Sequence, residues 1–307
     1  MAKKTFYSNG KLLITAEYLV LDGAEALAIP TVYGQDLKVS SAKSEDLFWT
    51  SKNEKGAVWF EAVFQIIPKL SIKSTTDHKI AETLLDILQT AKKLNAGFLT
   101  DFSGFEVITH LNFPREWGLG TSSTLINNIA QWAAVDAFDL LENSFRGSGY
   151  DIACAQTDTP IVYSKSKHVS KSQQINLKWP FTESLFFVYL NKKQDSKKAI
   201  AHYNALSQNK ELTIKKVNEL TKQFINCKSL SQFEELIVVH EDLLSNLLKI
   251  PTIKRSLFAD YSGSIKSLGA WGGDFVLVTR KDALAYFTER GYKTIIPFNE
   301  MVKKKGV

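Results

Sequence analysis

The sequence of 307 residues has few of the features that would place it in a specialised class of protein. It contains two cysteines, Cys154 and Cys227, both in apolar surroundings, so we expect no disulfide framework and a reducing compartment. No apolar run approaches the roughly 18 residues that a membrane-spanning helix needs. The N-terminal residues carry no apolar signal region. Together these absences predict a cytoplasmic protein that does not act in a membrane.

Patterns typical of nucleic-acid and metal binding are also missing. The five histidines are scattered along the chain and have no zinc-binding spacing. The formal net charge is +6, but the lysines are spread out and no basic helix carries interleaved aromatic residues. We therefore expect no nucleic acid as a partner, and a mildly basic surface that attracts a small anionic molecule. Nothing in the sequence indicates the oligomeric state.

The most informative stretch is a glycine-containing loop at residues 114–124, PREWGLGTSST, which is followed by apolar residues at helical spacing. This order predicts a tight loop that leads into the N-terminus of a helix. Glycine lets the backbone approach an anion closely, and the open amides and dipole of a first helical turn favour phosphate. The hydroxyl residues could cap the helix or reach a magnesium ion, and this stretch alone leaves both interpretations open.

Hydrophobic patterning predicts a mixture of strands and helices. Short apolar runs predict strands before residue 72, including one at residues 18–21, with a hairpin turn at residues 53–56. Ser231 and Glu234 have the spacing of a capping box, and the polar segment 164–175 is a candidate domain boundary. Further strands are expected at residues 104–111, 161–163, 185–190, 275–279 and 293–297, and helices at residues 77–94, 121–138, 211–226, 231–249, 252–260 and 281–290.

Two other stretches place glycines at turns. Residues 10–23, GKLLITAEYLVLDG, open with Lys11, and residues 266–275, KSLGAWGGDF, precede a strand that reads as buried. Taken singly, a lysine at the start of a strand is most often solvent-exposed, and a glycine-rich turn could be a β-bulge or a hairpin turn.

Taken in this order and at these spacings, the three stretches resemble the signature motifs of the GHMP kinases. That superfamily includes galactokinase, homoserine kinase, mevalonate kinase and phosphomevalonate kinase, and the resemblance covers nearly the whole chain. Three segments are similar to phosphomevalonate kinase and favour the mevalonate-pathway branch: Glu17 with Tyr18, residues 147–151 (GSGYD), and residues 272–274 (GGD) at the end of the third stretch.

Some positions depart from the pattern of the superfamily. Asn9 replaces a proline, and Ala16 and Trp271 each replace a glycine. The bulky indole of Trp271 could narrow the phosphate or substrate site. These departures leave the identity of the substrate open.

The resemblance implies an α+β architecture in two lobes. Residues 1–165 would form a nucleotide-binding lobe with a ribosomal-S5-type fold, and residues 166–307 a ferredoxin-like lobe. It also implies ATP- and magnesium-dependent phosphorylation of a small acidic metabolite, with phosphomevalonate and mevalonate as the leading substrates. The alternatives are a sugar or amino-acid kinase of the same superfamily, and a nucleotide-binding homologue without turnover. A diphosphomevalonate decarboxylase is a further relative, but the GSGYD segment resembles the kinases more.

The resemblance assigns a role to each matching residue. The backbone of the glycine loop would wrap the nucleotide phosphates through Gly118, Leu119, Gly120 and Thr121. Ser122 would ligate magnesium, and Ser123 would replace it if the loop were shifted by one residue.

The implied catalytic pair is Lys11 and Asp151. Asp151 would orient or deprotonate the attacking oxygen of the substrate, although it could also be a helix N-cap. Lys11 would contact Asp151 and the transferred phosphoryl group. Glu142 could be a second magnesium ligand, but its spacing from Asp151 favours a surface helix.

The remaining assignments are on the substrate side. Glu17 and Tyr18 belong to this set, and the glycines of the third stretch would let it pack closely on the active site. Asp274 could touch substrate or cap its turn. The substrate-side residues of the third stretch are Gly269, Gly272, Gly273 and Asp274.

Overall fold

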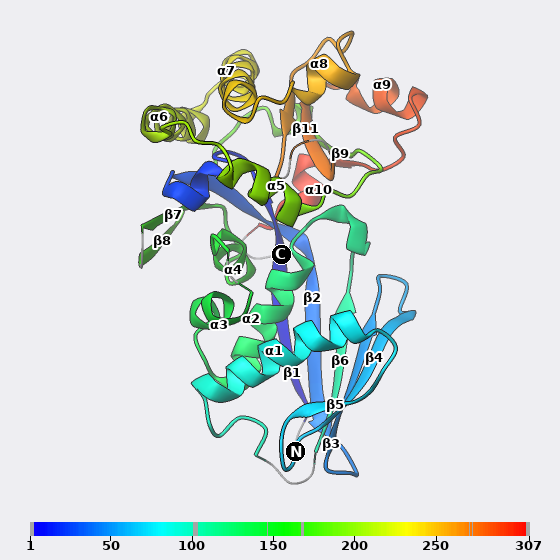
Figure 1. Ribbon diagram of the computed structural model, residues 1–307. Coiled ribbons are helices and arrows are strands. Elements are labelled where there is room, and N and C mark those ends of the chain that lie inside the picture. The colour runs from blue at the N-terminus through cyan, green and yellow to red at the C-terminus, as the bar shows by residue number, and fades with distance from the viewer. Residues whose placement is uncertain are drawn as a thin grey trace. The chain divides into compact units, whose positions relative to one another are not determined.

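The computed structural model describes residues 3–100, 104–145, 147–166, 169–269, 271 and 273–304. Its helices and strands form two compact units that are interleaved along the chain (Figure 1). Unit 1 consists of Met1–Gly10, Tyr33–Arg115 and Leu119–Gln156; unit 2 consists of Lys11–Val32, Glu116–Gly118 and Thr157–Val307. The expected division into lobes 1–165 and 166–307 stays a prediction. The long strands β1 (Lys4–Leu13) and β2 (Ala26–Ser41) each contribute residues to both units.

Unit 1 packs a mixed sheet against helices around one hydrophobic core. Its strands follow the order β5-β4-β3-β6-β2, in which β3 and β6 are parallel and the other neighbours antiparallel. The strands β4 and β6 alternate buried and exposed residues, as expected for strands with one face on a core. The elements are β3 (Asp46–Lys52), β4 (Val58–Gln65), β5 (Ser71–Thr75), α1 (His78–Leu94), β6 (Phe105–Leu111), α2 (Thr121–Ala133), α3 (Ala137–Ser144) and α4 (Tyr150–Ala155).

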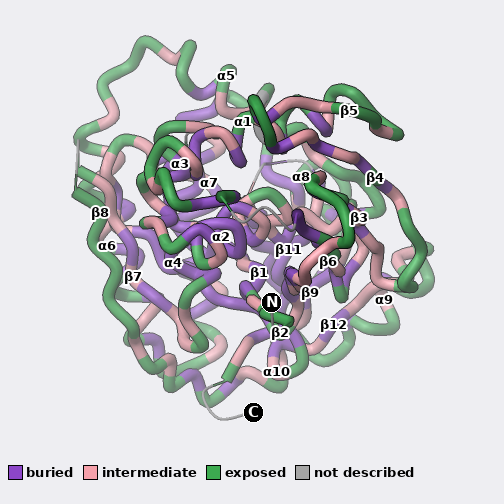
Figure 2. Tube along the Cα trace, turned by 90° about the horizontal axis from the view of Figure 1, so that it is seen from below, coloured by how far each residue is buried: buried purple, intermediate pink, exposed green. Residues whose placement is uncertain are grey.

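The helix α2 is largely buried within unit 1. Seven of its residues are buried, and Figure 2 shows much of it in the colour of buried residues. The helix α4 packs directly against it. Three polar side chains strengthen this arrangement: Asn127 of α2 accepts a hydrogen bond from Gln156 at 2.9 Å and donates one to Ser8 of β1 at 2.8 Å.

Unit 2 contains a four-stranded antiparallel sheet with the order β10-β11-β9-β12. The central strand β11 is buried at all five residues, which explains its uninterrupted apolar sequence. A second group of strands pairs the start of β2 with β7, and β7 with β8. The strands are β7 (Ile161–Ser166), β8 (Val169–Gln174), β9 (Leu185–Tyr189), β10 (Ile265–Ser267), β11 (Phe275–Thr279) and β12 (Ile295–Pro297).

Helices occupy most of the rest of unit 2. They are α5 (Ser196–Asn204), α6 (Glu211–Asn226), α7 (Leu230–Leu248), α8 (Ile253–Leu257), α9 (Ala283–Glu289) and α10 (Phe298–Met301). Short 3-10 turns lie at η1 (Leu19–Asp22), η2 (Arg115–Trp117) and η3 (Thr182–Ser184). No helix in the described ranges is both long and apolar enough to cross a membrane.

Several elements match the sequence-based expectations, and others correct them. The helices 77–94 and 211–226, the strand 275–279 and the hairpin at residues 53–56 are confirmed. The expected helix 121–138 is wrong at its end, since it divides into α2 and α3.

The division of that helix has a local cause. Ala134 adopts the left-handed conformation and ends α2, because its amide bonds back to Ala130 and Gln131. Asp136 then caps α3 by accepting from the amides of Phe138 and Asp139. The apolar periodicity runs on through this break, which is why the sequence suggested one helix.

Two further expectations are corrected. Residues 18–21, expected as a strand, include the 3-10 turn η1. The polar segment 164–175 contributes to the β7–β8 hairpin, and its role as a domain boundary stays a prediction. The helix α7 begins at Leu230 with Ser229 as its cap, so the capping box at Ser231 is wrong. The helix α5 was not expected.

Candidate active site

Residues from the three motifs meet inside unit 2. Lys11 is half-buried, and its Nζ donates a hydrogen bond to the carbonyl oxygen of Gly118 at 3.1 Å. A Cβ placed on Gly118 would lie 2.6 Å from the carboxyl carbon of Asp274, so these two residues are in close contact. The backbone of Gly118 has φ +68°, a conformation that glycine adopts without strain. The fold therefore joins one residue from each motif into a single cluster.

Asp274 is held on several sides. Its amide donates to the carbonyl oxygen of Lys192 at 2.7 Å, and its own carbonyl accepts from the amide of Leu190 at 2.8 Å. Its Oδ1 accepts from the amide of Gln194 at 3.1 Å. These partners belong to the segment 190–194 rather than to the glycine turn before Asp274, so both predicted roles, contact with substrate and capping of its turn, stay predictions.

The electrostatic surroundings of Asp274 are mixed. Burial raises the pKa of its carboxyl group above the ordinary value, while the Gln194 amide and the positive charges of Lys11 and Lys193 lower it. Gly273 packs closely beside it, because a Cβ there would lie 2.5 Å from the Lys192 carbonyl oxygen. Lys11 thus sits where its charge compensates a partly desolvated carboxylate.

Tyr18 and Trp271 connect the first and third motifs. The Tyr18 hydroxyl accepts a hydrogen bond from the Trp271 amide at 3.1 Å, and the Tyr18 ring stacks on Tyr203 with centroids 5.5 Å apart. Trp271 is 6% exposed, and its Nε1 is buried without a hydrogen-bond partner among the described atoms. The indole that replaces a glycine of the family pattern is therefore accommodated within unit 2.

Glu17 is fully buried among charged side chains of unit 2. It contacts Lys266, and its Oε2 lies 3.6 Å from Nε2 of His240, next to Glu241. This burial does not favour direct contact with a substrate, so the substrate-side role of Glu17 stays a prediction. Sequence reasoning missed Lys266, His240 and Glu241. The signal was present, because His240 and Glu241 occupy core-facing positions of the amphipathic helix α7.

The N-terminus of α2 lies in unit 1. Gly120 is at the N-cap position with φ 94°, and no side chain caps the first turn. The Thr124 hydroxyl is engaged elsewhere, since it donates to Gln35 Oε1 at 2.7 Å. The alternative in which a hydroxyl merely caps this helix is therefore wrong. Leu119 is buried and anchors the loop, whereas Ser122 is exposed.

Asp151 also lies in unit 1, in the first turn of α4. The N-cap position of α4 is Gly149, so the alternative in which Asp151 is the N-cap is wrong. Asp151 is half-buried, and its helix packs against α2. Glu142 is exposed on α3, as expected for a residue on a surface helix.

The predicted site residues are thus divided between the two units. Unit 1 holds Leu119, Gly120, Thr121, Ser122, Ser123 and Asp151. Unit 2 holds Lys11, Glu17, Tyr18, Gly118, Gly269, Gly273 and Asp274, while Gly272 lies outside the described residues. Gly269 has φ +66° and open space around it. Within unit 2 the structure brings Lys11, Gly118 and Asp274 together, and within unit 1 it packs the Asp151 helix on the helix of the glycine loop.

Comparison with known proteins places the fold. No protein-family model and no curated protein matches the sequence. Solved structures do match along nearly the whole chain. The mevalonate kinase of Methanococcus jannaschii has a TM-score of 0.68 at 14% identity, over 96% of this chain and 97% of that one.

Two other matches are equally extensive. The Streptococcus pneumoniae phosphomevalonate kinase, in complex with phosphomevalonate and AMPPNP, has a TM-score of 0.68 at 14% identity, over 95% of this chain and 99% of that one. The Lactococcus lactis galactokinase, complexed with galactose, has a TM-score of 0.69 at 13% identity, over 98% of this chain and 93% of that one. The chain has the fold of these GHMP kinases, which confirms the expected fold class.

Proposed function

We propose that this chain, which has the fold of the GHMP kinases, is an ATP- and magnesium-dependent kinase of isoprenoid precursor synthesis that phosphorylates phosphomevalonate or mevalonate. The observation that carries the proposal is the contact of Lys11 and Asp274 with Gly118, which joins residues of three distant motifs in unit 2. A glycine loop, a lysine and an acidic residue recur in phosphoryl-transfer sites, because the reaction needs charge neutralisation and positioning above all.

The N-terminus of α2 suits the phosphates of a nucleotide. The amides of residues 121–123 point out of the first helical turn, and no side chain caps them. Such amides and the helix dipole favour negative charge. Gly120, which precedes these amides, has no Cβ that would obstruct the approach of a phosphate. These residues fit ATP, and the AMPPNP complex of the similar phosphomevalonate kinase supports the same nucleotide.

The exposed hydroxyl of Ser122 would hold magnesium. An oxygen donor of this type suits the ion, which takes its other ligands from water and phosphate. When bound, magnesium neutralises charge on the phosphates. Ser123, which is half-buried on the next position of the turn, is the alternative ligand.

Asp151 and Lys11 would supply the remaining chemistry. Asp151 orients the attacking oxygen of the acceptor and takes its proton, if it carries one, onto the carboxylate. Lys11 adds a positive charge that favours the negatively charged transferring group. Its amine is already directed by the Gly118 carbonyl, so little further ordering is needed.

The choice of acceptor rests on the motifs more than on the fold. The segment 147–151 and the pair Gly273 and Asp274 favour phosphomevalonate, whose phosphate would become a diphosphate. Mevalonate would instead be phosphorylated at a hydroxyl. Galactokinase matches the fold as well as the mevalonate-pathway kinases do, so a sugar kinase is the second candidate. The thiols of Cys154 and Cys227 are buried and form no disulfide within the described part of the chain, which supports a reducing cytoplasm.

The test is an ADP-release assay with magnesium-ATP and four acceptors: mevalonate, phosphomevalonate, galactose and homoserine. We expect turnover with phosphomevalonate or mevalonate. Asp151→Asn should lower kcat by roughly 100-fold or more and leave ATP binding unchanged. The matched control is Asp139→Asn, an exposed carboxylate in the first turn of α3, which should retain full activity.

The other outcomes are equally informative. Turnover with galactose alone would replace the proposed substrate by a sugar. Binding of ATP without turnover on any acceptor would contradict the proposed kinase and favour a nucleotide-binding homologue, for which the departures at Asn9 and Trp271 would then be the first residues to revert.

A further inference from the structure

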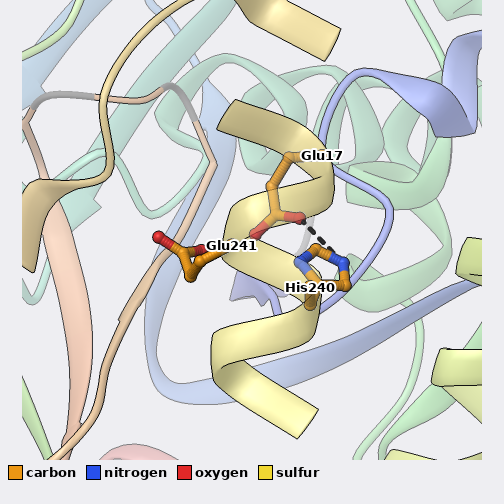
Figure 3. Close-up of side chains that lie close together, drawn as sticks. All are labelled: Glu17, His240 and Glu241. Atoms are coloured by element: carbon orange, nitrogen blue, oxygen red, sulfur yellow. Dashed lines mark ion pairs between the residues drawn. The ribbon is translucent and has the colours of Figure 1, made fainter. Parts of the chain in front are cut away.

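A fully buried network of charged residues connects two of the motifs within unit 2. Lys266 of β10 contacts Oε1 of Glu17, and its Nζ also donates to Glu241 Oε1 at 3.1 Å and to the Ser267 carbonyl oxygen at 2.6 Å. The side chains of Lys266 and Glu17 are 0% exposed. Figure 3 shows Glu17 directed toward α7, from which His240 and Glu241 project. The network therefore joins the first motif, the third motif and α7.

Glu241 holds the start of the third motif through hydrogen bonds. Its Oε1 accepts from the Ser267 amide at 3.1 Å, and its Oε2 accepts from the Ser267 hydroxyl at 2.8 Å. With the bond to Lys266, both carboxylate oxygens are engaged. Ser267 is the last residue of β10, so Glu241 fixes the point at which the strand gives way to the glycine segment that leads to Asp274.

His240 holds the first motif. Its Nε2 accepts a hydrogen bond from the amide of Ala16 at 3.2 Å. Ala16 has φ 67° and Tyr18 has φ 62°, conformations that residues with a Cβ adopt only where their surroundings hold them. The ring nitrogen that accepts this bond carries no proton, so His240 is neutral. The turn that presents Tyr18 thus depends on a neutral histidine from α7.

The same residues do not form a metal site. Glu17, His240 and Glu241 offer ligand atoms within 4.8 Å of one another, a separation compatible with a bound ion. The ammonium group of Lys266 already contacts the carboxyl groups of Glu17 and Glu241 and supplies the positive charge that an ion would bring. Lys266 takes the place of the cation, and the geometry indicates a structural connection.

We propose that Glu241, Lys266 and His240 are positioning residues, which hold the turn at residues 16–18 and the start of the third motif in the arrangement that phosphoryl transfer uses. The effect on catalysis rests on the proposed function, whereas the holding of the two segments does not. The held segments lead to the cluster described above. Tyr18 accepts from the Trp271 amide, and Asp274 lies against Gly118, which accepts from Lys11.

The first measurement is hydrogen–deuterium exchange of the backbone amides of Ala16 and Ser267. In Glu241→Ala, exchange at Ser267 should rise roughly 10- to 100-fold, since a hydrogen bond to a charged acceptor is lost. The rise should be local and should exceed that in the core strand β11. Glu235→Ala, an exposed glutamate on the same helix, is the matched control and should leave both amides unchanged.

The second measurement separates positioning from general destabilisation. In Glu241→Ala, kcat should fall roughly 10- to 100-fold, as for a small misplacement of reacting groups, while KM for ATP stays within a few-fold. Glu241→Gln keeps an acceptor for Ser267 and should recover part of kcat. If Glu241→Ala does not fold, Ser267→Ala removes only the hydroxyl contact and should give a smaller, local rise in exchange.

The outcomes distinguish this proposal from the proposed function. Unchanged exchange at Ala16 and Ser267 in a folded Glu241→Ala protein overturns the positioning network. A local rise in exchange, together with a wild-type protein that turns over none of the four acceptors, supports the holding of the two segments and contradicts the kinase. Equal loss of kcat in Glu241→Ala and Glu235→Ala also overturns the proposal.

Discussion

Gly118 and the carboxylate of Asp274 are so close that a single added carbon atom would not fit between them. A Cβ on Gly118 would lie 2.6 Å from both the carboxyl carbon and Oδ2 of Asp274. Gly118 also has φ +68°, in the left-handed region that costs other residues roughly 1–2 kcal/mol. Two independent physical reasons therefore require glycine at this position of the loop.

Gly118→Ala should lower the free energy of unfolding by about 2 to 4 kcal/mol, through backbone strain and the clash with Asp274 together. The matched control is Gly291→Ala, also in unit 2. Gly291 has φ +84° but open space where the methyl group would go, so only the strain of about 1–2 kcal/mol applies. Urea denaturation of both variants measures the difference.

The double variant Gly118→Ala/Asp274→Ala sharpens this test. Removing the carboxylate leaves room for the new methyl group, so the two substitutions should be non-additive. Equal losses of stability in Gly118→Ala and Gly291→Ala would contradict the close contact with Asp274.

Lys11 should also control the protonation of Asp274. Burial raises the pKa of Asp274, and among the charged groups Lys11 opposes this most strongly, followed by Lys193. Lys11→Met should therefore raise the pKa of Asp274 further, since the carboxylate form loses a favourable charge. Carbon NMR of labelled aspartate, assigned with Asp274→Asn, measures it.

Lys193→Met is the control for that titration and should give the smaller increase. A pKa of Asp274 that does not move in Lys11→Met would show that the lysine charge does not reach the carboxylate.

The parts of the site that follow from local backbone requirements could be predicted from sequence. Gly118 and Gly120 bracket a tight turn before an apolar-periodic run, and the structure has that turn and α2 at this place. The strand Phe275–Thr279 was predictable for a similar reason, because five consecutive apolar residues suit a strand buried on both faces.

The parts that depend on tertiary contacts could not be predicted. Lys266 and Glu17 are 249 positions apart, and nothing local to either residue indicates that they share a buried site. The helix α5 was not predicted, because its sequence, SKKAIAHYN, has little apolar periodicity. From the sequence, the indole of Trp271 was expected to narrow the phosphate or substrate site, but in the structure Trp271 is buried beside Tyr18.

The start of α7 offers a direct test of cap assignment. Ser229 accepts from the Gln232 amide at 3.2 Å, whereas Ser231 lies within the helix. Ser229→Ala should lower the free energy of unfolding by about 1 kcal/mol, the usual cost of losing a cap. Ser231→Ala should change it by less than about 0.5 kcal/mol. Chemical denaturation of the two variants compares them, and the reverse order would restore the capping box at Ser231.

The buried network predicts that the free energy of unfolding depends on pH, and the direction of this dependence differs between Glu17 and His240. Burial raises the pKa of Glu17 from 4.5 to about 7, against the opposing charge of Lys266. Folded protein therefore keeps a proton on Glu17 that the unfolded chain releases above pH 4.5, and the stability from Glu17 is lost as pH rises to about 7.

His240 acts in the opposite direction. Burial, and then the charge of Lys266, lowers its pKa well below 6.5. The folded protein therefore leaves His240 neutral where the unfolded chain binds a proton, so the stability from His240 is lost as pH falls below 6.5. Between pH 5 and 6.5 the two contributions oppose each other, and the wild-type protein should show little net effect from this pair.

Single substitutions should separate the two contributions. Relative to wild type, His240→Gln should shift the difference in unfolding free energy between pH 7.5 and pH 5 by about 2 kcal/mol in favour of pH 5. Glu17→Gln should shift the same difference by about 3 kcal/mol in favour of pH 7.5. Urea denaturation at the two pH values measures both shifts, and referring each variant to wild type removes the contribution of every other titrating group. Because Gln at 240 still offers an acceptor to the Ala16 amide, the shift reports the lost titration rather than a broken turn. Shifts of the same sign in the two variants would mean that Glu17 and His240 do not hold opposite protonation states in the folded network.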